Sequence, residues 1–425
     1  MRRFIPKFAF SAYHFLLSFL GAAFYGWPSR KMTVIGVTGT KGKTTTSNLI
    51  AQLLEQAGHR VGLATTVNFK IGEKDWINSA KQTMLGRFRL QKLLREMLLA
   101  KCRYAVVETS SEGILQHRHR FIDYDAVVFT NLSPEHIERH GCFEKYRQAK
   151  EKLFAQAARK KNGIGVYNLD DPCVEHFLKY EVKNKYGYFQ DPANAQAAIT
   201  DKFQISKIAL EKDGTEFELN GQKFKTALIG EMNVYNVVSA LCVAAALGLE
   251  WSKLPALAAK LTAPSGRMQL INRGQAFTVI VDYAHEPSSL KAAYQTARLF
   301  RPRRIIGILG AQGGGRDRGK RARLGEIAGQ YADYVFVTNE DPYDEDPWRI
   351  INDVAQGVSG KPAEKILDRT KAIEAALKLA RPDDLVLITG KGGEVSMCVE
   401  NGKKLPCSDE KTVKEILDNF GQDKK

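Results

Sequence analysis

A glycine-rich stretch near the N-terminus, GVTGTKGKTTT at residues 36–46, constrains the fold more than any other part of the sequence. The apolar run at 33–37 predicts a strand before it, and the helical spacing of 44–58, which ends on Gly58, predicts a helix after it. A strand, a glycine loop and a helix, in that order, are the context that a phosphate-binding loop needs. The spacing nevertheless departs from the usual motif, because Val37 stands where the first glycine would fall.

The residues of this loop suit a nucleotide phosphate and a magnesium ion. Backbone N–H groups of small residues can surround a phosphate, and the following helix adds its positive end. Lys43 can reach the terminal phosphates, and the Thr44 hydroxyl can bind Mg²⁺. The strand and the helix on either side argue against a glycine-rich turn that binds nothing. The predicted ATP-binding residues of the loop are Gly39, Thr40, Lys41, Gly42, Lys43, Thr44 and Thr45.

Alternating strands and helices after the loop indicate an α/β fold. Apolar runs at 104–108, 125–131 and 163–168 are separated by helical stretches, which predicts a mostly parallel sheet with helices on both faces. Residues 203–228 carry Asp-Gly and Asn-Gly turns between alternating runs and predict a small antiparallel subsheet. A helix is expected at about 233–247.

The stretch at 261–269 breaks this pattern, and a fresh alternation of strands and helices follows it. The alternation predicts a second, Rossmann-like α/β domain. Its expected strands lie at 277–282, 303–309, 333–338 and 384–389. We therefore expect an apolar N-terminal helix in 1–30, a P-loop domain at 31–264 and a C-terminal domain at 265–425.

Residues 8–27 contain no charged side chain, and the segment is long enough to span a bilayer. A cleaved signal peptide fits poorly, because a nucleotide loop begins soon afterwards and ATP is cytosolic. Two interpretations remain open. The segment is either a helix packed on the body of the protein, or an interfacial or membrane-anchoring helix.

The chain is strongly basic, and its cysteines are scattered. A net charge of +16 favours anionic partners such as nucleotides, diphosphate-bearing substrates, nucleic acid or an acidic membrane. No block of like charges predicts a nucleic-acid-binding tail. The six cysteines form no CxxC pair, which fits a reducing cytosol better than a disulfide framework or a zinc site.

Two further motifs carry polar residues at the ends of predicted strands. Glu108 ends the strand at 104–108, where its carboxylate suits Mg²⁺, although an exposed glutamate would explain it equally well. His136 and His140 lie four residues apart after the strand at 125–131. A pair of surface histidines explains that spacing better than a metal site.

Taken in order, these motifs resemble the Mur ligase family. TGTKGKTTT, E-x-S-S, TNL-x-x-E-H-x-x-x-HG and YRQAKEKLF follow one another, and PSGRMQLI, VDYAHEPSSL, GGGRDRGKR, NEDPYDEDP and GKGGE come later. The later segments resemble the MurE type, and the resemblance covers about residues 31–400. This family carries TGT[NK]GKT[ST], which accounts for the unusual loop spacing.

The resemblance implies an ATP-dependent amide ligase of peptidoglycan synthesis. The MurE type joins a diamino acid (meso-diaminopimelate, lysine or ornithine) to UDP-N-acetylmuramoyl-L-alanyl-D-glutamate through an acyl phosphate. Because ATP supplies the leaving group, the protein's task is positioning and charge neutralisation. The resemblance also implies a cytoplasmic monomer that binds no nucleic acid. The apolar residues 8–27, outside the resemblance, leave open a contact with the inner face of the cell membrane.

The family's catalytic and metal-binding residues map onto this sequence. Lys43 would hold the transferring phosphate, Thr44 and Glu108 would hold one Mg²⁺, and His136 would hold a second. Lys150 matches a lysine that is N-carboxylated in the family and binds near the metals as a carbamate. The sequence alone would favour a lysine on a helix surface.

Further positions match the family's nucleotide and substrate contacts. Those for the base and ribose of ATP are Asn233, Asn236, Arg267 and Asp282. Those for the acidic acceptor are Thr83, Ser110, Gln116 and Arg118, and His285 belongs to the DYAH motif. Arg316 and Glu394 match positions that contact the incoming amino acid, where an arginine suits a carboxylate and a glutamate suits an amine.

The sequence departs from the family pattern on the substrate side. Only about 30 residues precede the P-loop domain, so the usual domain that grips uridine diphosphate is not expected, and a lipid-linked or shortened acceptor is an alternative. The remaining departures are Glu112 and Gly393 in place of histidines, and Met84 in place of a threonine.

The motif that selects the amino acid also differs. The D-N-P-R pattern of diaminopimelate enzymes reads Glu340-Asp341-Pro342-Tyr343 here. Glu340, Asp341 and the nearby Asp344 suit a distal amine, as in lysine or ornithine, unless Arg318 or Arg321 replaces the missing arginine.

Two other functions stay open at this point. One is another amide ligase of the same superfamily, of the folylpolyglutamate or cyanophycin type, against which the GGGRDRGKR and DYAH segments argue. The other is a non-catalytic nucleotide-binding scaffold of the cell wall. A degenerate scaffold would have been free to lose Lys43, Glu108, His136 and Lys150, and all four are present.

Overall fold

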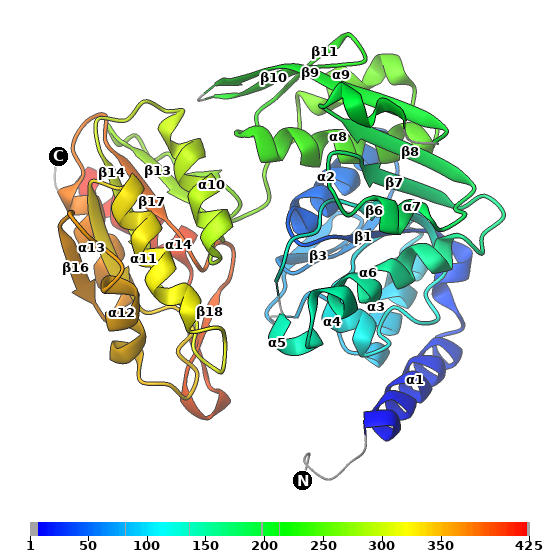
Figure 1. The fold of residues 1–425 in the computed structure, drawn as a ribbon, viewed down its shortest axis with the longest axis horizontal. Coiled ribbons are helices and arrows are strands. Elements are labelled where there is room, and N and C mark those ends of the chain that lie inside the picture. The colour runs from blue at the N-terminus through cyan, green and yellow to red at the C-terminus, as the bar shows by residue number, and fades with distance from the viewer. Residues whose placement is uncertain (1–6, 81, 136, 197–198, 212, 423–425) are drawn as a thin grey trace. The chain divides into compact units, whose positions relative to one another are not determined.

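The chain forms two compact α/β units, Met1–Thr262 and Ala263–Lys425, in a computed structural model (Figure 1). The structure describes residues 7–80, 82–135, 137–196, 199–211 and 213–422. Each unit has its own sheet and its own helices, which confirms the predicted α/β class.

The first unit is built on an eleven-stranded sheet in the order β11-β10-β9-β8-β7-β6-β1-β5-β2-β3-β4. Its strands are β1 Thr33–Thr38, β2 Val61–Ala64, β3 Asn68–Ile71, β4 Lys74–Ile77, β5 Tyr104–Glu108, β6 Tyr124–Phe129, β7 Ile164–Asn168, β8 Asn184–Phe189, β9 Asp201–Glu211, β10 Gly214–Leu219 and β11 Gln222–Thr226. Its helices are α1 Lys7–Phe24, α2 Lys43–Gln56, α3 Arg87–Leu99, α4 Ser111–Leu115, α5 Ile137–His140, α6 Phe143–Ala157, α7 Glu175–Leu178, α8 Glu231–Ala246 and α9 Leu254–Ala258.

Strand β1 lies at the centre of this sheet and pairs in parallel with β5 on one side and β6 on the other. Its residues are apolar or β-branched and almost all buried, as a strand covered on both faces requires. Helices α3 and α6 pack on one face, and α2 and α8 pack together on the other. Strand order reverses at β1, so the carboxyl ends of β1, β5 and β6 meet where open α/β sheets place their ligands.

Both edges of the sheet are antiparallel. Strands β9, β10 and β11 form the predicted antiparallel group, which continues the main sheet because β8 pairs with β9. Asn220 and Gly221 both have positive φ, as an Asn-Gly hairpin turn needs. At the other edge, β3 and β4 extend β2 with four-residue strands that are too short to show a clear period in the sequence.

The second unit has a six-stranded sheet in the order β12-β13-β17-β14-β15-β16 and a separate two-stranded pair, β18 with β19. Its strands are β12 Gln269–Leu270, β13 Thr278–Val281, β14 Ile305–Leu309, β15 Tyr334–Thr338, β16 Ala363–Ile366, β17 Leu385–Ile388, β18 Ser396–Cys398 and β19 Lys404–Pro406. Its helices are α10 Pro287–Arg298, α11 Gly319–Tyr331, α12 Pro347–Ala355, α13 Arg369–Leu379 and α14 Asp409–Gln422. Helices α10, α11 and α12 cover one face of the larger sheet, and α13 and α14 cover the other.

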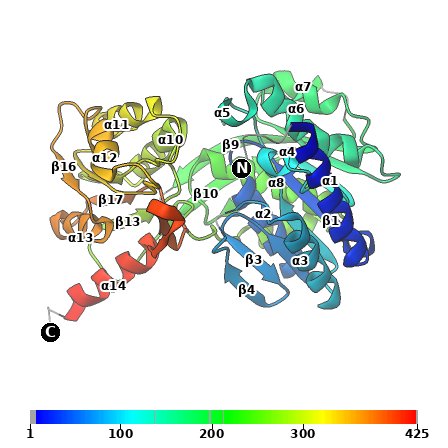
Figure 2. The ribbon, with the colours of Figure 1, turned by 90° about the horizontal axis from the view of Figure 1, so that it is seen from below.

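Helix α1 packs along α3 of the first unit (Figure 2). Gly21 lies against α3, where a Cβ would be in ordinary contact, 3.4 Å from the Phe88 Cα. Among the described residues, no helix is both long enough and apolar enough to cross a membrane.

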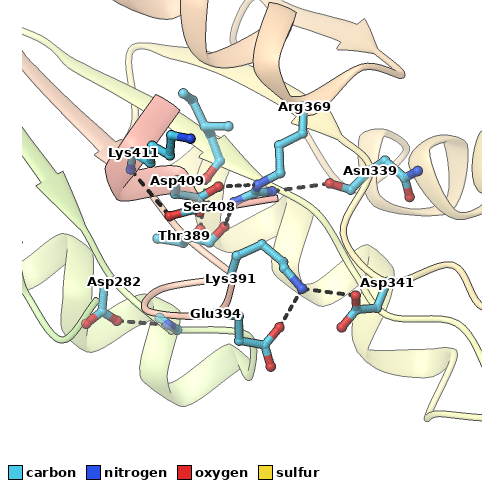
Figure 3. A network of polar contacts seen from close by, with 12 residues as sticks. Asp282, Asn339, Asp341, Arg369, Thr389, Lys391, Glu394, Ser408, Asp409 and Lys411 are labelled. Atoms are coloured by element: carbon cyan, nitrogen blue, oxygen red, sulfur yellow. Dashed lines mark hydrogen bonds and ion pairs between the residues drawn. The ribbon is translucent and has the colours of Figure 1, made fainter. Parts of the chain in front are cut away.

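A buried ion pair joins α13 to α14. The Arg369 guanidinium donates to both carboxylate oxygens of Asp409, each at 2.7 Å, and also to the Thr389 carbonyl at 2.8 Å (Figure 3). Burial alone lowers the pKa of Arg369, but the Asp409 carboxylate more than offsets this and raises it.

We expect Asp409→Asn to destabilise the second unit by about 3–5 kcal/mol, because it leaves a buried guanidinium without its counter-charge. Urea unfolding of the variant and the unchanged chain measures the difference. Glu374→Gln, which breaks an exposed pair with Lys378, is the matched control and should cost no more than about 1 kcal/mol. Equal losses in the two variants would contradict this account.

Candidate functional site

The glycine loop connects the end of β1 to the start of α2, as predicted. Gly42 has φ 78° at the N-cap of α2, a backbone conformation that favours glycine. A Cβ at Gly39 would lie 1.9 Å from the Thr130 hydroxyl oxygen, and one at Gly42 would lie 2.3 Å from Asn236 Oδ1. Neighbouring side chains therefore pack so closely that both positions need glycine.

The loop is held from the end of β6. The Thr130 hydroxyl donates to the Lys41 carbonyl at 2.7 Å, and the Lys41 N–H donates to Asn131 Oδ1 at 2.9 Å. The Lys43 ammonium donates to the Thr40 carbonyl at 2.7 Å, within the same loop. Sequence reasoning missed Thr130 and Asn131 as loop supports, although their position after a buried strand could have indicated them.

Glu108 lies beside the loop, where β5 ends. Its Oε2 accepts a hydrogen bond from the Thr44 hydroxyl at 2.9 Å, and the carboxylate also accepts two from Thr66, from its N–H at 2.8 Å and its hydroxyl at 3.0 Å. The side chain is only 2% exposed, so the alternative of an exposed glutamate is wrong. A hydroxyl and a carboxylate in contact offer the oxygen ligands that Mg²⁺ prefers, so these residues fit the ion.

Thr66 also connects Glu108 to a predicted substrate residue. Its hydroxyl oxygen lies 3.0 Å from the Thr83 hydroxyl and can accept from it, because the Thr66 proton is donated to Glu108. Thr66 was missed in the sequence because it follows β2, a four-residue strand.

Lys150 is fully buried on α6 rather than on a helix surface. Its amino group donates to the Gly39 carbonyl and lies 4.6 Å from the centre of the Tyr146 ring. Burial, with the nearby Lys43 charge, lowers the pKa of Lys150 well below its usual value, although Glu135 and Glu108 oppose the shift. Burial therefore favours the unprotonated form of the Lys150 amine next to the phosphate loop.

The two predicted histidines differ in what the structure says of them. His136 lies outside the described residues. His140 is buried, with Nε2 3.1 Å from the Ser111 hydroxyl and its ring edge-on to Tyr146. The surface interpretation is therefore wrong for His140.

The predicted acceptor residues of the first unit cluster around α4. The Ser110 hydroxyl caps this helix by accepting from the Gly113 N–H at 3.2 Å. Gln116 Oε1 accepts from the Arg118 guanidinium at 2.7 Å and from Arg87 at 3.4 Å. The two arginines give this region the positive charge that an acidic acceptor needs.

Two asparagines of α8 support the loop from behind. Asn236 Oδ1 accepts from the Thr46 hydroxyl at 3.2 Å, and the Asn236 amide donates to Asn233 Oδ1 at 3.0 Å. The Asn233 amide donates to the Ile229 carbonyl at 2.9 Å. Both asparagines are buried, so the visible role of each side chain is to support the loop and α8.

The second unit has its own polar centre, with Lys391 at the middle (Figure 3). The buried Lys391 ammonium donates to Asp341 Oδ1 at 3.0 Å and to Glu394. Asp341 Oδ1 also accepts from the Cys398 N–H at 2.7 Å, and Glu394 accepts from the Tyr283 hydroxyl at 3.5 Å. The structure thus brings together the predicted residues Asp341 and Glu394 through a lysine that the sequence analysis had not singled out.

The predicted ATP residues of this unit lie next to the same centre. The Arg267 guanidinium stacks 4.3 Å from the centre of the Tyr283 ring. The Asp282 carboxylate accepts from the Met268 N–H at 2.7 Å and the Ala284 N–H at 2.8 Å, and burial raises its pKa. His285 Nδ1 lies 2.8 Å from the Tyr283 carbonyl.

Glu340 is a fully buried carboxyl group without a hydrogen bond to either oxygen among the described residues. Burial raises its pKa to about 7, and Asp341 adds to the shift while Arg369 and Lys391 oppose it. A Cβ at Gly390, whose φ is 107°, would lie 2.4 Å from Glu340 Oε2. Glycine at residue 390 therefore leaves room for the Glu340 carboxyl group, which has no hydrogen-bond partner among the described residues.

The arginines around the amino-acid motif have different surroundings. Arg316 lies near Tyr343, where its charge opposes the rise that burial causes in the pKa of the Tyr343 hydroxyl. Arg321 is fully buried and donates to Glu345 and Asp353, each at 2.9 Å. Arg321 is thus already bound to two carboxylates, and Arg318 is more than half exposed beside Glu345.

The first unit pairs a phosphate loop with a hydroxyl–carboxylate pair that suits Mg²⁺, and the second holds a charged cluster on a Rossmann-like sheet. This combination is typical of enzymes that use a nucleoside triphosphate to activate a substrate.

Comparisons with known proteins then place the chain. Residues 37–244 match the Mur ligase middle domain, and residues 266–392 match the Mur ligase glutamate ligase domain. The chain belongs to the Mur ligase family, whose members are ATP-dependent ligases that form amide bonds. The resemblance seen in the sequence is confirmed.

Individual relatives extend over most of the chain. A UDP-N-acetylmuramyl-tripeptide synthetase of Roseiflexus sp. (strain RS-1) is 38% identical over 399 residues, covering 89% of this chain and 77% of that protein. A UDP-N-acetylmuramoyl-L-alanyl-D-glutamate–2,6-diaminopimelate ligase of Bacillus cereus is 35% identical, covering 93% and 80%. A solved structure of a ligase of the latter name is 31% identical, with a TM-score of 0.63, covering 92% of this chain and 79% of that one.

A folylpolyglutamate synthase of Mycobacterium tuberculosis has a TM-score of 0.71 over 88% of this chain and 92% of that one. Its identity is only 21%, so this similarity shows the fold alone.

Proposed function

We propose that the chain joins a diamino acid to UDP-N-acetylmuramoyl-L-alanyl-D-glutamate at the expense of ATP, in peptidoglycan synthesis. The observation that carries the proposal is the 38% identity over 89% of the chain to a synthetase of this kind. The intact phosphate loop and the Thr44–Glu108 pair support catalysis over a non-catalytic scaffold. The alternative of a folylpolyglutamate-type ligase is supported only by a similarity of fold.

In the first unit, the loop amides and the Lys43 ammonium hold the transferring phosphate of ATP. The acceptor carboxylate attacks that phosphate, ADP leaves, and an acyl phosphate forms. The amine of the incoming amino acid then attacks the carbonyl carbon of the acyl phosphate, inorganic phosphate leaves, and the nitrogen loses a proton to give the amide. Arg118, Gln116, Ser110 and Thr83 orient the acidic acceptor. Each residue acts by position and charge, since the leaving phosphate comes from ATP.

Thr44 and Glu108 would hold one Mg²⁺, and His136, which the family motif assigns, would hold a second. When bound, Mg²⁺ neutralises the phosphate oxygens during transfer. We also propose that Lys150 is N-carboxylated. The lowered pKa favours the unprotonated amine, whose lone pair attacks the carbon of CO₂. One C=O π bond opens onto oxygen and the nitrogen releases one proton to water, which gives a carbamate anion beside the loop.

In the second unit, Asn339 to Tyr343 and the Lys391 centre select the amino acid. Arg316 binds its carboxylate, and Glu394 with the carboxyl group of Glu340 binds amines. An unpartnered buried carboxyl group is costly unless a ligand supplies the missing hydrogen bonds. This supports lysine or ornithine, whose distal amine would satisfy Glu340, over meso-diaminopimelate. Arg267 and Asp282 bind the nucleotide, as do Asn233 and Asn236 of the first unit, and His285 contacts substrate.

Release of phosphate from ATP with the UDP-linked dipeptide tests the function, with lysine, ornithine and meso-diaminopimelate supplied in parallel. Release with lysine or ornithine, and a product heavier by that residue, supports the proposal. Release with meso-diaminopimelate alone would support the proposed ligation but contradict the proposal that the amino acid is lysine or ornithine. If no phosphate is released with any of the three amino acids, the UDP-linked dipeptide is not the acceptor.

Glu340→Gln should raise the KM for the diamino acid by about ten- to a hundred-fold, because a charge-assisted hydrogen bond is lost. The Glu340 carboxyl group, with a pKa of about 7, is neutral below that pH and anionic above it. The KM of the unchanged chain should therefore fall as pH rises through about 7, and that of the variant should not. Steady-state kinetics across this range, with Glu374→Gln as control, measure both effects. A flat profile in the unchanged chain would contradict the role.

We further propose that the chain works as a monomer in the cytoplasm, where ATP is available, with residues 8–27 against the inner face of the cell membrane. The apolar character of that segment supports the contact.

A further inference from the structure

Helix α1 exposes a row of apolar side chains that a helix packed only on a protein core would bury. Its outward side chains include Tyr13, Leu16, Leu20 and Phe24, which are 56%, 53%, 44% and 76% exposed. They recur every three or four residues and so form one stripe. An amphipathic helix on a soluble protein normally buries this stripe.

The most buried side chains of α1 are small instead. Ser18 and Ala22 are buried, and the Ser18 hydroxyl donates to the His117 carbonyl at 2.8 Å. The Ser11 hydroxyl lies 2.8 Å from His117 Nε2. With the close approach of Gly21 to α3, these contacts fix which side of α1 faces the protein, so the apolar stripe is held outward in the folded chain.

The stripe continues into an aromatic cluster. The rings of Phe15 and Phe19 meet Phe121 edge-on, with centres 5.1 and 5.5 Å apart, and Trp27 lies 5.8 Å from Phe121. Phe88 of α3 adds another exposed ring next to Phe24. An apolar patch of this kind on a protein surface marks an interaction site.

A basic cavity adjoins the aromatic cluster. It has a volume of about 300 Å³ and is lined by Trp27 and Phe121 together with four cationic side chains, Arg30, Arg120, Arg159 and Lys160. The Arg30 guanidinium stacks 4.5 Å from the centre of the Trp27 ring. Among the described lining residues the one carboxylate, Asp123, is bound to Lys160 at 2.7 Å. The three arginines therefore give the cavity a positive field.

We propose that the outer face of α1 and this basic cavity form one docking surface for a bilayer rich in anionic lipid. The apolar stripe would enter the boundary between head groups and acyl chains, and the arginines would meet the lipid phosphates. Charge supports this occupant, because residues 1–54 contain no Asp or Glu and the chain carries a net charge of +16. A second copy fits less well, because a symmetric pairing through this surface would bring like charges together. The inference deepens the proposed membrane contact, rests on it, and does not depend on the ligation reaction.

Flotation of the full chain with lipid vesicles tests the proposal. We expect binding to vesicles of equal parts phosphatidylcholine and phosphatidylglycerol, and much weaker binding to phosphatidylcholine alone. A double variant, Leu16→Ser with Leu20→Ser, should lose about ten-fold in affinity for each leucine. Leu405→Ser, which alters an exposed leucine of the second unit, is the matched control and should bind as the unchanged chain does.

A second variant separates the cavity from the helix. Arg30→Gln with Arg159→Gln should weaken binding to the anionic vesicles about five-fold for each charge and leave binding to phosphatidylcholine unchanged. Ligation of the soluble UDP-linked dipeptide should be the same in both variants, so a failure of docking and a failure of the proposed reaction are distinguishable. Equal binding to both vesicle types, or no binding to either, would overturn the proposal. So would a dimer in light scattering that disappears in the leucine variant.

Discussion

Lys43→Ala should lower kcat for ATP-dependent ligation by about a thousand-fold, the loss expected when one preorganised positive group is removed from a transferring phosphate. The ammonium group of Lys43 lies in the glycine loop and donates to the Thr40 carbonyl at 2.7 Å. This places it among the backbone groups that would surround the phosphate. Steady-state phosphate release with saturating acceptor and amino acid measures the effect.

The fold should survive this change, because the Lys43 side chain is partly exposed and the loop is held by Thr130 and Asn131. Thermal unfolding of the variant should therefore match that of the unchanged chain. Lys92→Ala on α3, an exposed lysine far from the loop in sequence, is the control and should keep full activity. If the Lys43 variant keeps most of its kcat, the loop does not act in catalysis as proposed, and the non-catalytic scaffold becomes the better interpretation.

The sequence alone could predict those elements whose signals are local. β1, β5, β7 and the start of α2 appear as apolar runs and a glycine loop, and their observed bounds differ by only one residue or so from those expected. Gly58 has positive φ just after the end of α2, as its place in the pattern suggested, and Gly42 has positive φ at the start of that helix. Burial on both faces makes such strands easy to recognise.

Features that depend on distant contacts could not be predicted in this way. β3, β4 and β16 are four-residue strands with mixed composition, and pairing with neighbours rather than local preference makes them strands. Thr66 and Lys391 acquire their partners only through the fold. The orientation of α1 depends on contacts such as the one between Ser18 and His117, nearly a hundred residues later in the chain.

Lys150 shows how a usable signal can be overlooked. On α6, the buried residues Tyr146, Ala149, Leu153 and Phe154 recur at helical spacing, and Lys150 lies within the stripe that they form. Its place in the stripe brings Lys150 to the side of α6 that packs on the protein, and burial lowers its pKa. The periodicity places Lys150 on the buried face of α6, and only the resemblance to the family predicts what its amine is for.

Lys150→Ala should therefore lower kcat by about a hundred- to a thousand-fold, since the variant loses the anionic ligand that we propose for the metal site. Added formate or acetate should restore part of the activity, because a small carboxylate can occupy the space that the carbamate leaves. Lys150→Arg should be as inactive and should not recover, because a guanidinium fills that space and cannot be carboxylated. Phosphate release with and without added carboxylate measures both variants.

Two further observations decide between a carbamate and a lysine that acts only through its charge. The unchanged chain, equilibrated with ¹³C-bicarbonate, should give a carbamate carbon signal in NMR that both Lys150 variants lack. Lys152→Ala, two residues along the same helix and exposed, is the matched control and should keep both the signal and the activity. Full activity of Lys150→Arg without any carbamate signal in the unchanged chain would show that charge alone suffices. Loss of activity that no carboxylate restores, again without the signal, would reduce Lys150 to a support for the Gly39 carbonyl of the phosphate loop.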